Sequence, residues 1–206
     1  MAKAYFEHPG KAVDDNRFSH MMAIALDPSS GYKRGVIRCI MSREGDVETR
    51  GYVDRSELHT IFGETLEKFT VGEQLKIANE KEILQQLGEE EWDFIGLEDP
   101  DIFMDEKTRL THLYFTMPLI SKDKTKEESR IHLGHAVGKN LDSLEMTMPA
   151  LQADAKNTAK EVSIAPVNSR GVRLNLFESS SVENNVWYST VRIGITEDMG
   201  SPWRFG

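Results

Sequence analysis

The chain has 206 residues, of which 39% are hydrophobic and 29% charged, the composition of an ordinary globular protein with a core of its own. Its formal net charge of −9, with Lys and Arg scattered along the chain, argues against a nucleic-acid partner. A single cysteine, Cys39, excludes an internal disulfide, and the absence of a long apolar run predicts no membrane partner, no signal peptide and a cytoplasmic location.

Strand-like segments dominate the first half of the chain. Apolar residues at 20–26 and 34–41 flank the turn sequence DPSSG, which predicts a β-hairpin or a longer β-loop-β unit. Residues 78–91 form the one good helix pattern, with apolar residues at helical spacing, Asn79 as a cap and Gly88 as a terminator.

The second half resumes the strand pattern. Residues 130–137 alternate so that Ile131, Leu133 and His135 would share one face of a strand. Eight or nine strands with almost no crossover helices predict an all-β fold of hairpin-linked antiparallel sheets, as a sandwich, a barrel or a propeller. The other strand candidates are residues 57–62, 100–104, 109–119, 161–167, 172–179 and 186–196.

A loose internal repeat favours the propeller among these folds. Two phrases, GHAVGKNLDSLE and IGITEDMGSPWRFG, each place a small residue in a strand and an acidic turn just after it. A repeat of several short strands per unit is typical of propeller blades.

Four phrases together resemble glycoside hydrolase family 130. GLEDPDIF followed by LYFT resembles the family's "G-x-E-D-P-R-[IV] … Y-x-x-Y-T", and the phrases at 132–145, 159–179 and 193–206 are similar to later family phrases, in the right order. The family contains β-mannoside phosphorylases and hydrolases on a five-bladed β-propeller. The resemblance therefore implies a single propeller-type domain over residues 1–206 with about three blades, hence an incomplete one, acting on β-mannosides or related oligosaccharides.

Two departures from the family phrases bear on the reaction. The Arg that follows EDP in the family is Asp101 here, and the Ser of two later phrases is replaced by Gly138 and Thr196. An arginine suits bidentate binding of phosphate, whereas a carboxylate inverts the local charge. Phosphorolysis, with inorganic phosphate as a co-substrate, and hydrolysis are therefore both open. We expect no other cofactor.

Cleavage of a glycosidic bond usually requires one carboxyl group that protonates the leaving oxygen and a second that acts as base or nucleophile. The resemblance assigns the proton-donor role to Asp99. We expect Glu98 and Asp99 to point to opposite faces of an extended segment, with Pro100 holding Asp99 in that extended conformation. Glu98 and Asp101 would raise the pKa of a neighbouring carboxyl, as a proton donor requires.

Candidates for the second carboxylate are Glu161 and Glu178, each beside a strand in the matching phrases; either is equally read as a solvated strand-end residue. Cations and a histidine near these phrases are candidates for contacts with sugar hydroxyls or phosphate, the alternatives being surface cations and a buried structural histidine. Trp92, Trp187 and Trp203 suit stacking on sugar rings as well as a core. The predicted substrate-binding residues are Arg38, Glu98, Asp101, His135, Lys160 and Arg173.

Three alternatives accompany this hypothesis. The EDPD tetrapeptide has ordinary turn chemistry, and clustered carboxylates also suit Ca²⁺, although one Cys and no close His pair lead us to predict no metal. The chain is otherwise a non-catalytic propeller remnant that binds a glycan or a protein, with homo-oligomer formation left open. Geometry separates these hypotheses, because catalysis requires Asp99 and a second carboxylate to converge on one pocket.

Overall fold

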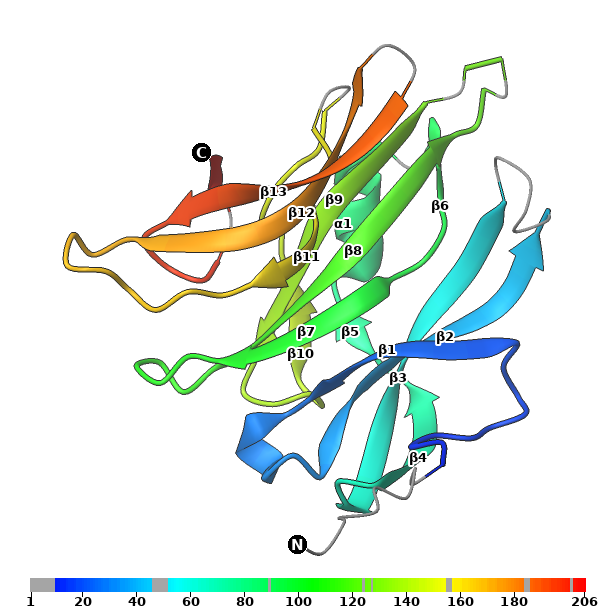
Figure 1. The fold of residues 1–206 in the computed structure, drawn as a ribbon, viewed down its shortest axis with the longest axis vertical. Helices are drawn as coiled ribbons and strands as arrows, with labels where there is room; N and C mark the ends of the chain where they lie inside the picture. The colour runs from blue at the N-terminus through cyan, green and yellow to red at the C-terminus, as the bar shows by residue number, and fades with distance from the viewer. Residues whose placement is uncertain are drawn as a thin grey trace, which may run out of the picture.

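The computed structural model describes residues 10–45, 52–88, 90–123, 125–126, 128–154, 157–183, 186–200 and 202–206, the side chains of 182, 183 and 187 excepted. Within these ranges the regular structure consists of three mainly antiparallel sheets, one α-helix and one short 3-10 helix. Each sheet is built from strands that are consecutive in the sequence: β1 to β4, β5 to β10, and β11 to β14 (Figure 1). This arrangement confirms the prediction of an all-β, propeller-like fold with about three blades.

The first sheet is a meander in which each strand pairs with the next along the chain. The predicted hairpin between 20–26 and 34–41 is confirmed, since β1 and β2 are antiparallel. Their connection contains the 3-10 helix η1 (Pro28–Ser30), where the Asp27 carboxylate accepts a hydrogen bond from the Ser29 amide at 2.8 Å. The strands are β1 (His20–Leu26), β2 (Arg34–Glu44), β3 (Val53–Thr65) and β4 (Lys68–Gln74).

The second sheet has the strand order β5-β10-β9-β8-β6, and β7 pairs with another part of the long strand β8. Only β5 and β10 pair in parallel, in the part of this sheet that the structure describes. Its strands are β5 (Ile77–Ala78), β6 (Trp92–Phe94), β7 (Glu98–Met104), β8 (Thr111–Ser121), β9 (Ser129–Gly138) and β10 (Leu144–Met146).

The helix α1 (Glu80–Gln86) lies between β5 and β6 and is shorter than the predicted 78–91. Asn79 occupies the N-cap position, but its side chain makes no capping hydrogen bond. Gly88, with a φ of 85°, follows the last turn and donates its amide to the Gln85 carbonyl at 3.1 Å. The left-handed glycine ends the helix, as predicted, and makes it shorter than the apolar pattern suggests.

The third sheet is again a meander, in the order β11-β12-β13-β14. Strands β12 and β13 form an unbroken ladder from Arg173 opposite Thr196 to Glu183 opposite Val186. The strands of the third sheet are β11 (Lys160–Ser163), β12 (Arg173–Glu183), β13 (Val186–Thr196) and β14 (Arg204–Phe205).

Two apolar cores join the three sheets. One packs the first sheet and α1 against the second sheet, with Leu58, Leu113 and Phe115 at its centre. The other packs the second sheet against the third, through Tyr114, Phe177 and neighbouring residues. Burial of large apolar side chains at both contacts, the main favourable term in folding, fixes how the sheets face one another.

Gly96 allows the first and second sheets to approach closely. Ser56 and Gly96 form a parallel bridge, and Gly96 has a φ of 131°. A Cβ atom at this position would lie 1.9 Å from the Ser56 carbonyl oxygen, so only glycine fits. This contact places Ser56 beside the start of β7, next to the site described below.

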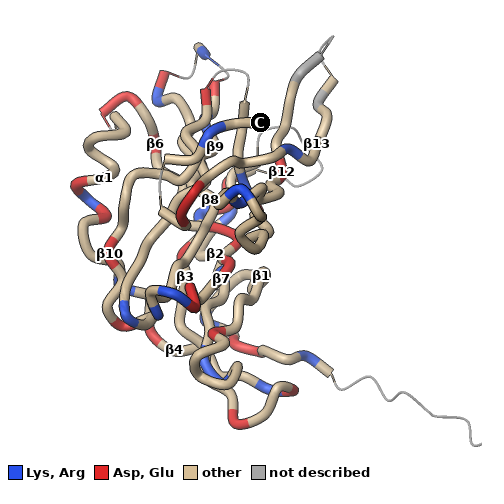
Figure 2. The backbone as a smooth tube through the Cα atoms, turned by 90° about the vertical axis from the view of Figure 1, so that its left-hand side faces the viewer, with Lys and Arg blue, Asp and Glu red and all other residues tan. Residues whose placement is uncertain are grey.

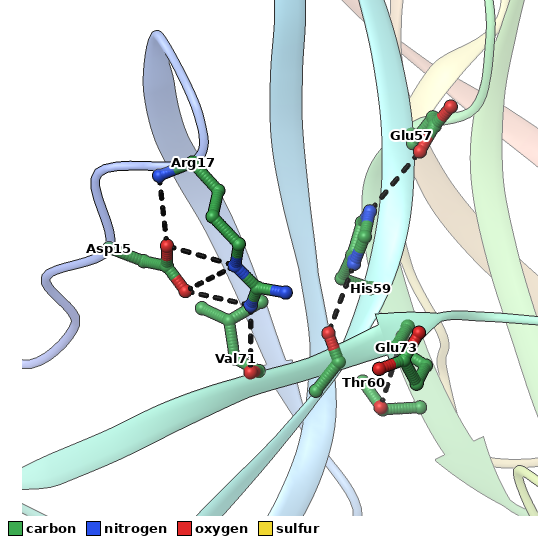
Figure 3. Close-up of polar contacts among 8 residues, drawn as sticks. Asp15, Arg17, Glu57, His59, Thr60, Val71 and Glu73 are labelled. Atoms are coloured by element: carbon green, nitrogen blue, oxygen red, sulfur yellow. Dashed lines mark hydrogen bonds and ion pairs between the residues drawn. The ribbon is translucent and has the colours of Figure 1, made fainter.

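Val13 and Phe18, which precede the first strand, pack against an apolar cluster of the first sheet, and Figure 3 shows Asp15 and Arg17 beside Val71 of the same sheet. The Asp15 carboxylate pairs with Arg17, which also donates to the Val71 carbonyl at 3.0 Å. Phe18 meets the His59 ring edge-on at 4.8 Å, and His59 in turn contacts the Glu57 carboxylate at 3.2 Å. These contacts attach the described N-terminal segment to the first sheet.

Lys and Arg are interspersed with Asp and Glu along the described parts of the chain (Figure 2). In the described parts of the chain, no helix has both the length and the apolar character needed to cross a membrane.

Candidate active site in the groove between the three sheets

The three sheets present equivalent irregular edge strands to one another. Strand β7 contacts both β1 and β11, and it lies between them in Figure 1. Each of the three strands has a β-bulge, and a residue within each bulge has a positive φ: Ala23 at 52°, Asp99 at 44° and Glu161 at 46°. A non-glycine residue in this conformation is strained by about 1 kcal/mol or more, and such strain concentrates at functional sites.

The bulges border an open groove of about 930 Å³. A second, narrower lobe of about 360 Å³ adjoins it, and Met22, Asp99 and Glu161 line both. The wide lobe is lined by Met22, Ala23, Asp99, Pro100, Asp101, Glu161, Val162, Ser163, Leu176, Phe177, Glu178, Ser189, Thr190 and Val191. Asp99 of the second sheet and Glu161 of the third therefore both lie where the two lobes join, although they are 62 positions apart in the sequence (from 99 to 161).

Arg38 of β2 connects the first sheet to the acidic segment. Its guanidinium donates to the Asp99 carboxylate at 3.0 Å, to the Glu98 carboxylate at 2.6 Å and to the Ser56 hydroxyl at 2.9 Å. The expectation that Glu98 and Asp99 point to opposite faces is wrong, since one side chain binds both. The prediction of an extended Asp99 is also wrong: at the bulge its φ is 44°, which turns its side chain to the same side as that of Glu98.

Glu98 is nearly enclosed, with 14% of its side chain exposed. Burial raises its pKa from the ordinary 4.5 to about 7; Arg38 opposes this and Asp99 adds to it. Desolvation outweighs the attraction of Arg38 because that guanidinium is shared with Asp99 and Ser56. Glu98 thus exchanges its proton near neutral pH.

On the opposite wall, Lys160 lies between two carboxylates of the third sheet. Its ammonium is 3.2 Å from Glu178 and 3.9 Å from Glu161, and Ser189 also donates to Glu178 at 3.0 Å. Burial raises the pKa of Glu161; Lys160 lowers it, while Glu178 and Asp99 raise it further. The charge of Asp99 thus acts on Glu161, although the two residues belong to different sheets.

Asp101 lines the wide lobe beside Asp99, as the residue that replaces the family's arginine. Burial raises the pKa of Asp101, and a hydrogen bond from the Ile102 amide opposes this.

Two predicted residues do not reach the groove. His135 is 1% exposed, with one ring nitrogen 2.9 Å from His112 and the other 2.8 Å from the Thr147 hydroxyl. Arg173 donates to the Ala165 carbonyl at 2.7 Å and lies over the Phe103 ring. His135 is therefore a buried structural histidine, the alternative named in the sequence analysis.

Two of the three tryptophans, Trp92 and Trp203, are buried away from the lining. Trp92 is buried beneath the Arg130 guanidinium, and Trp203 is buried against Tyr114. The side chain of Trp187 lies outside the described residues.

Sequence reasoning missed three contributors to the site. Ser56 supports Arg38 and also donates to Glu98 at 3.2 Å. Tyr52 lines the narrow lobe and is 44% exposed, which suits it for stacking on a sugar ring. Met22 lines both lobes. Only the acidic neighbourhood gave a signal in the sequence; a serine, a tyrosine and a methionine in strands gave none.

Chemically, the junction offers one carboxylate on each side of the groove, together with the cations Arg38 and Lys160. Glycoside cleavage requires two carboxyl groups, one on each side of the scissile bond of the substrate. One protonates the leaving oxygen, and the other activates water or acts as the nucleophile. Lys160 and Arg38 each contact carboxylates, so their charge is largely compensated within the site.

No protein-family model matches the chain, and no curated protein matches it. Among solved structures, the matches include an N-acetylgalactosamine deacetylase from F. plautii in complex with blood group B trisaccharide, at 13% identity and a TM-score of 0.39, over 77% of this chain and 39% of that one.

Two other matches are exo-β-1,3-galactanases. That from Phanerochaete chrysosporium has 9% identity and a TM-score of 0.40 over 88% of this chain, and that from Clostridium thermocellum has 8% and 0.38 over 84%. This chain spans 48% and 46% of their respective lengths. Similarity at this level identifies neither a family nor an activity.

Proposed function

We propose that this chain carries the active site of a carbohydrate-active enzyme that cleaves β-mannosides or related oligosaccharides, with Asp99 and Glu161 as the reacting carboxyl groups. The observation that carries the proposal is that these two residues, each at a strained bulge of a different sheet, line the junction of one groove. The GLEDPDIF phrase, which resembles family 130, supplies the substrate class and assigns Asp99 as the proton donor.

Water is the favoured acceptor in this proposal. The two cations of the narrow lobe, Arg38 and Lys160, contact carboxylates already, and Asp101 adds an acidic group to the wide lobe. A phosphate dianion would meet compensated cations and neighbouring carboxylates, which disfavours its binding. Phosphorolysis therefore ranks second to hydrolysis.

The test is incubation of the protein with a panel of β-manno-oligosaccharides, with and without phosphate, followed by detection of free sugar and sugar 1-phosphate. Free sugar without a phosphate requirement is the expected product, and turnover should fall by about 10²-fold or more in Asp99→Asn and in Glu161→Gln. Absence of turnover on every substrate would remove the enzyme proposal.

The leaving group assigns the proton donor. From a 2,4-dinitrophenyl glycoside the weakly basic 2,4-dinitrophenolate leaves without protonation, so the variant that lacks the proton donor should retain activity on this substrate. If Glu161→Gln is rescued in this way and Asp99→Asn is not, the roles assigned to the two residues are exchanged.

A second candidate function is non-catalytic glycan binding. It is favoured by the hydrogen bond that ties the Asp99 carboxylate to Arg38. Binding of manno-oligosaccharides that persists without turnover in the wild type would support this candidate.

A further inference from the structure

The two lobes of the groove differ in chemical character. Arg38, Glu98 and Lys160 line the narrow lobe together with Tyr52. Charged groups of both signs accept and donate hydrogen bonds, and an aromatic face packs on the C–H face of a pyranose ring. This lobe therefore suits a sugar ring with its hydroxyl groups.

The wide lobe is apolar over most of its walls. Leu176 on β12 and Val191 on β13 face it with exposed fractions of 47% and 72%, and Pro100 and Phe177 also line it. Among the described residues that line this lobe there is no Lys or Arg. Exposed aliphatic side chains beside a binding groove indicate an apolar ligand surface.

Most polar groups of the wide lobe are acidic or already bonded. Glu178 contacts Lys160 and accepts a hydrogen bond from Ser189. Few side-chain donors remain there for the hydroxyls of a second sugar ring, because the lining has no Lys or Arg and the Ser189 and Thr190 hydroxyls donate to protein oxygens. The acidic rim also disfavours an anion.

Given the glycoside-cleaving function proposed above, on which this inference rests, we propose that the substrate is a glycoside with an uncharged, apolar aglycone. The sugar occupies the narrow lobe, the glycosidic oxygen lies between Asp99 and Glu161, and the aglycone packs on Leu176 and Val191. In hydrolysis, a carboxyl proton goes to the glycosidic oxygen and the bond from that oxygen to the anomeric carbon breaks. Water then adds to that carbon and its released proton restores the carboxyl, giving free sugar and an alcohol.

The test measures binding by titration calorimetry with matched methyl and hexyl β-mannosides, β-glucosides and β-galactosides, with β-mannobiose and hexanol for comparison. The wild-type chain should bind the hexyl glycoside of its preferred sugar about tenfold more tightly than the methyl glycoside, because part of the hexyl chain leaves water. It should also bind that hexyl glycoside more tightly than mannobiose or hexanol.

Matched variants locate the effect. Leu176→Ser and Val191→Ser should abolish the hexyl advantage, because they should weaken binding of the hexyl glycoside much more than binding of the methyl glycoside. Leu174 is the control: it lies on the same face of β12, is 44% exposed and does not line the groove, so Leu174→Ser should keep the advantage.

The outcomes separate this inference from the function beneath it. Equal binding of methyl and hexyl glycosides, or tightest binding of mannobiose, overturns the apolar aglycone while the sugar site stands. An equal loss in the Leu174 and Leu176 variants overturns the assigned wall. Binding of hexanol as tightly as the hexyl glycosides, or binding of no glycoside, overturns the proposed function and this inference with it.

Discussion

Replacement of Glu98 by glutamine tests the electrostatics of the site through stability alone. Glutamine keeps a side-chain oxygen for Arg38 and Ser56 but never ionises. A carboxyl whose pKa rises from 4.5 in the unfolded chain to about 7 in the fold is harder to ionise in the fold, by about 3 kcal/mol. The wild type therefore has this contribution in full below about pH 4.5 and loses it as the pH rises to about 7.

The expected result is a pH-dependent difference between wild type and variant. Measured by urea denaturation, the unfolding free energy of Glu98→Gln relative to wild type should increase by about 3 kcal/mol from pH 4 to pH 8. Other titrating groups are common to both proteins and cancel in the difference. Glu197→Gln, at an exposed position, controls for the loss of a carboxylate as such.

Two results would refute this reasoning. A difference that stays constant from pH 4 to pH 8 would mean that Glu98 ionises as easily in the fold as in the unfolded chain. A variant that loses stability toward pH 8 would mean that the ion pair with Arg38 outweighs the burial of Glu98, and that its pKa is lowered.

The bulge at Ala23 should be relieved by glycine: Ala23→Gly should stabilise the fold by about 0.5–1 kcal/mol in urea, whereas Ala25→Gly on the same strand should destabilise it, and a loss in both would contradict the strain. Gly96→Ala should cost at least about 2 kcal/mol, because its Cβ would meet the Ser56 carbonyl; a cost under about 0.5 kcal/mol would mean that the sheets can separate freely. Burial lowers the pKa of His135 to about 3, so the stability that depends on neutral His135 is lost as the pH falls below about 6.5. His135→Asn should therefore make the unfolding free energy less dependent on pH between about 6.5 and 3. An unchanged pH dependence would count against a buried neutral histidine.

The repeat seen in the sequence is not the repeat that builds the site. The acidic closing phrases suggested blades, yet the feature shared by all three sheets is the bulge, occupied by Ala23, Asp99 and Glu161. Three residues with different side chains give no common sequence signal, because the equivalence lies in the backbone. Ala23, the one member without a carboxylate, contributes an apolar wall to the wide lobe.

Alternating apolar residues located most strands of seven or more residues, although β4 (Lys68–Gln74) was not predicted. The strand predicted at 186–196 is β13, and 20–26 is β1, because long ladders carry enough alternating residues to reveal their period. Strands β5, β6, β10 and β14, of two or three residues each, were missed because such segments are too short to show any periodicity.

In the acidic segment 98–101, the residues of interest could be chosen from the sequence, but the directions of their side chains could not. Its composition singled out Glu98, Asp99 and Asp101, but side-chain direction was wrongly predicted from an extended backbone. A bulge, imposed by pairing with β8, turned Asp99 toward Arg38. The bulge could not be predicted from residues 98–101 alone, because it depends on how β7 pairs with β8.

The sequence alone determined the all-β class and most of the long strands, since these depend on local periodicity. The proposed role of Asp99 comes instead from the resemblance of the GLEDPDIF phrase to family 130. Only the tertiary structure decided that Glu161 meets Asp99 in one groove, that His135 is buried and that Arg173 lies elsewhere. The physical reason is that burial and sheet packing act between residues distant in the chain, and they set both side-chain exposure and the neighbours of each charge.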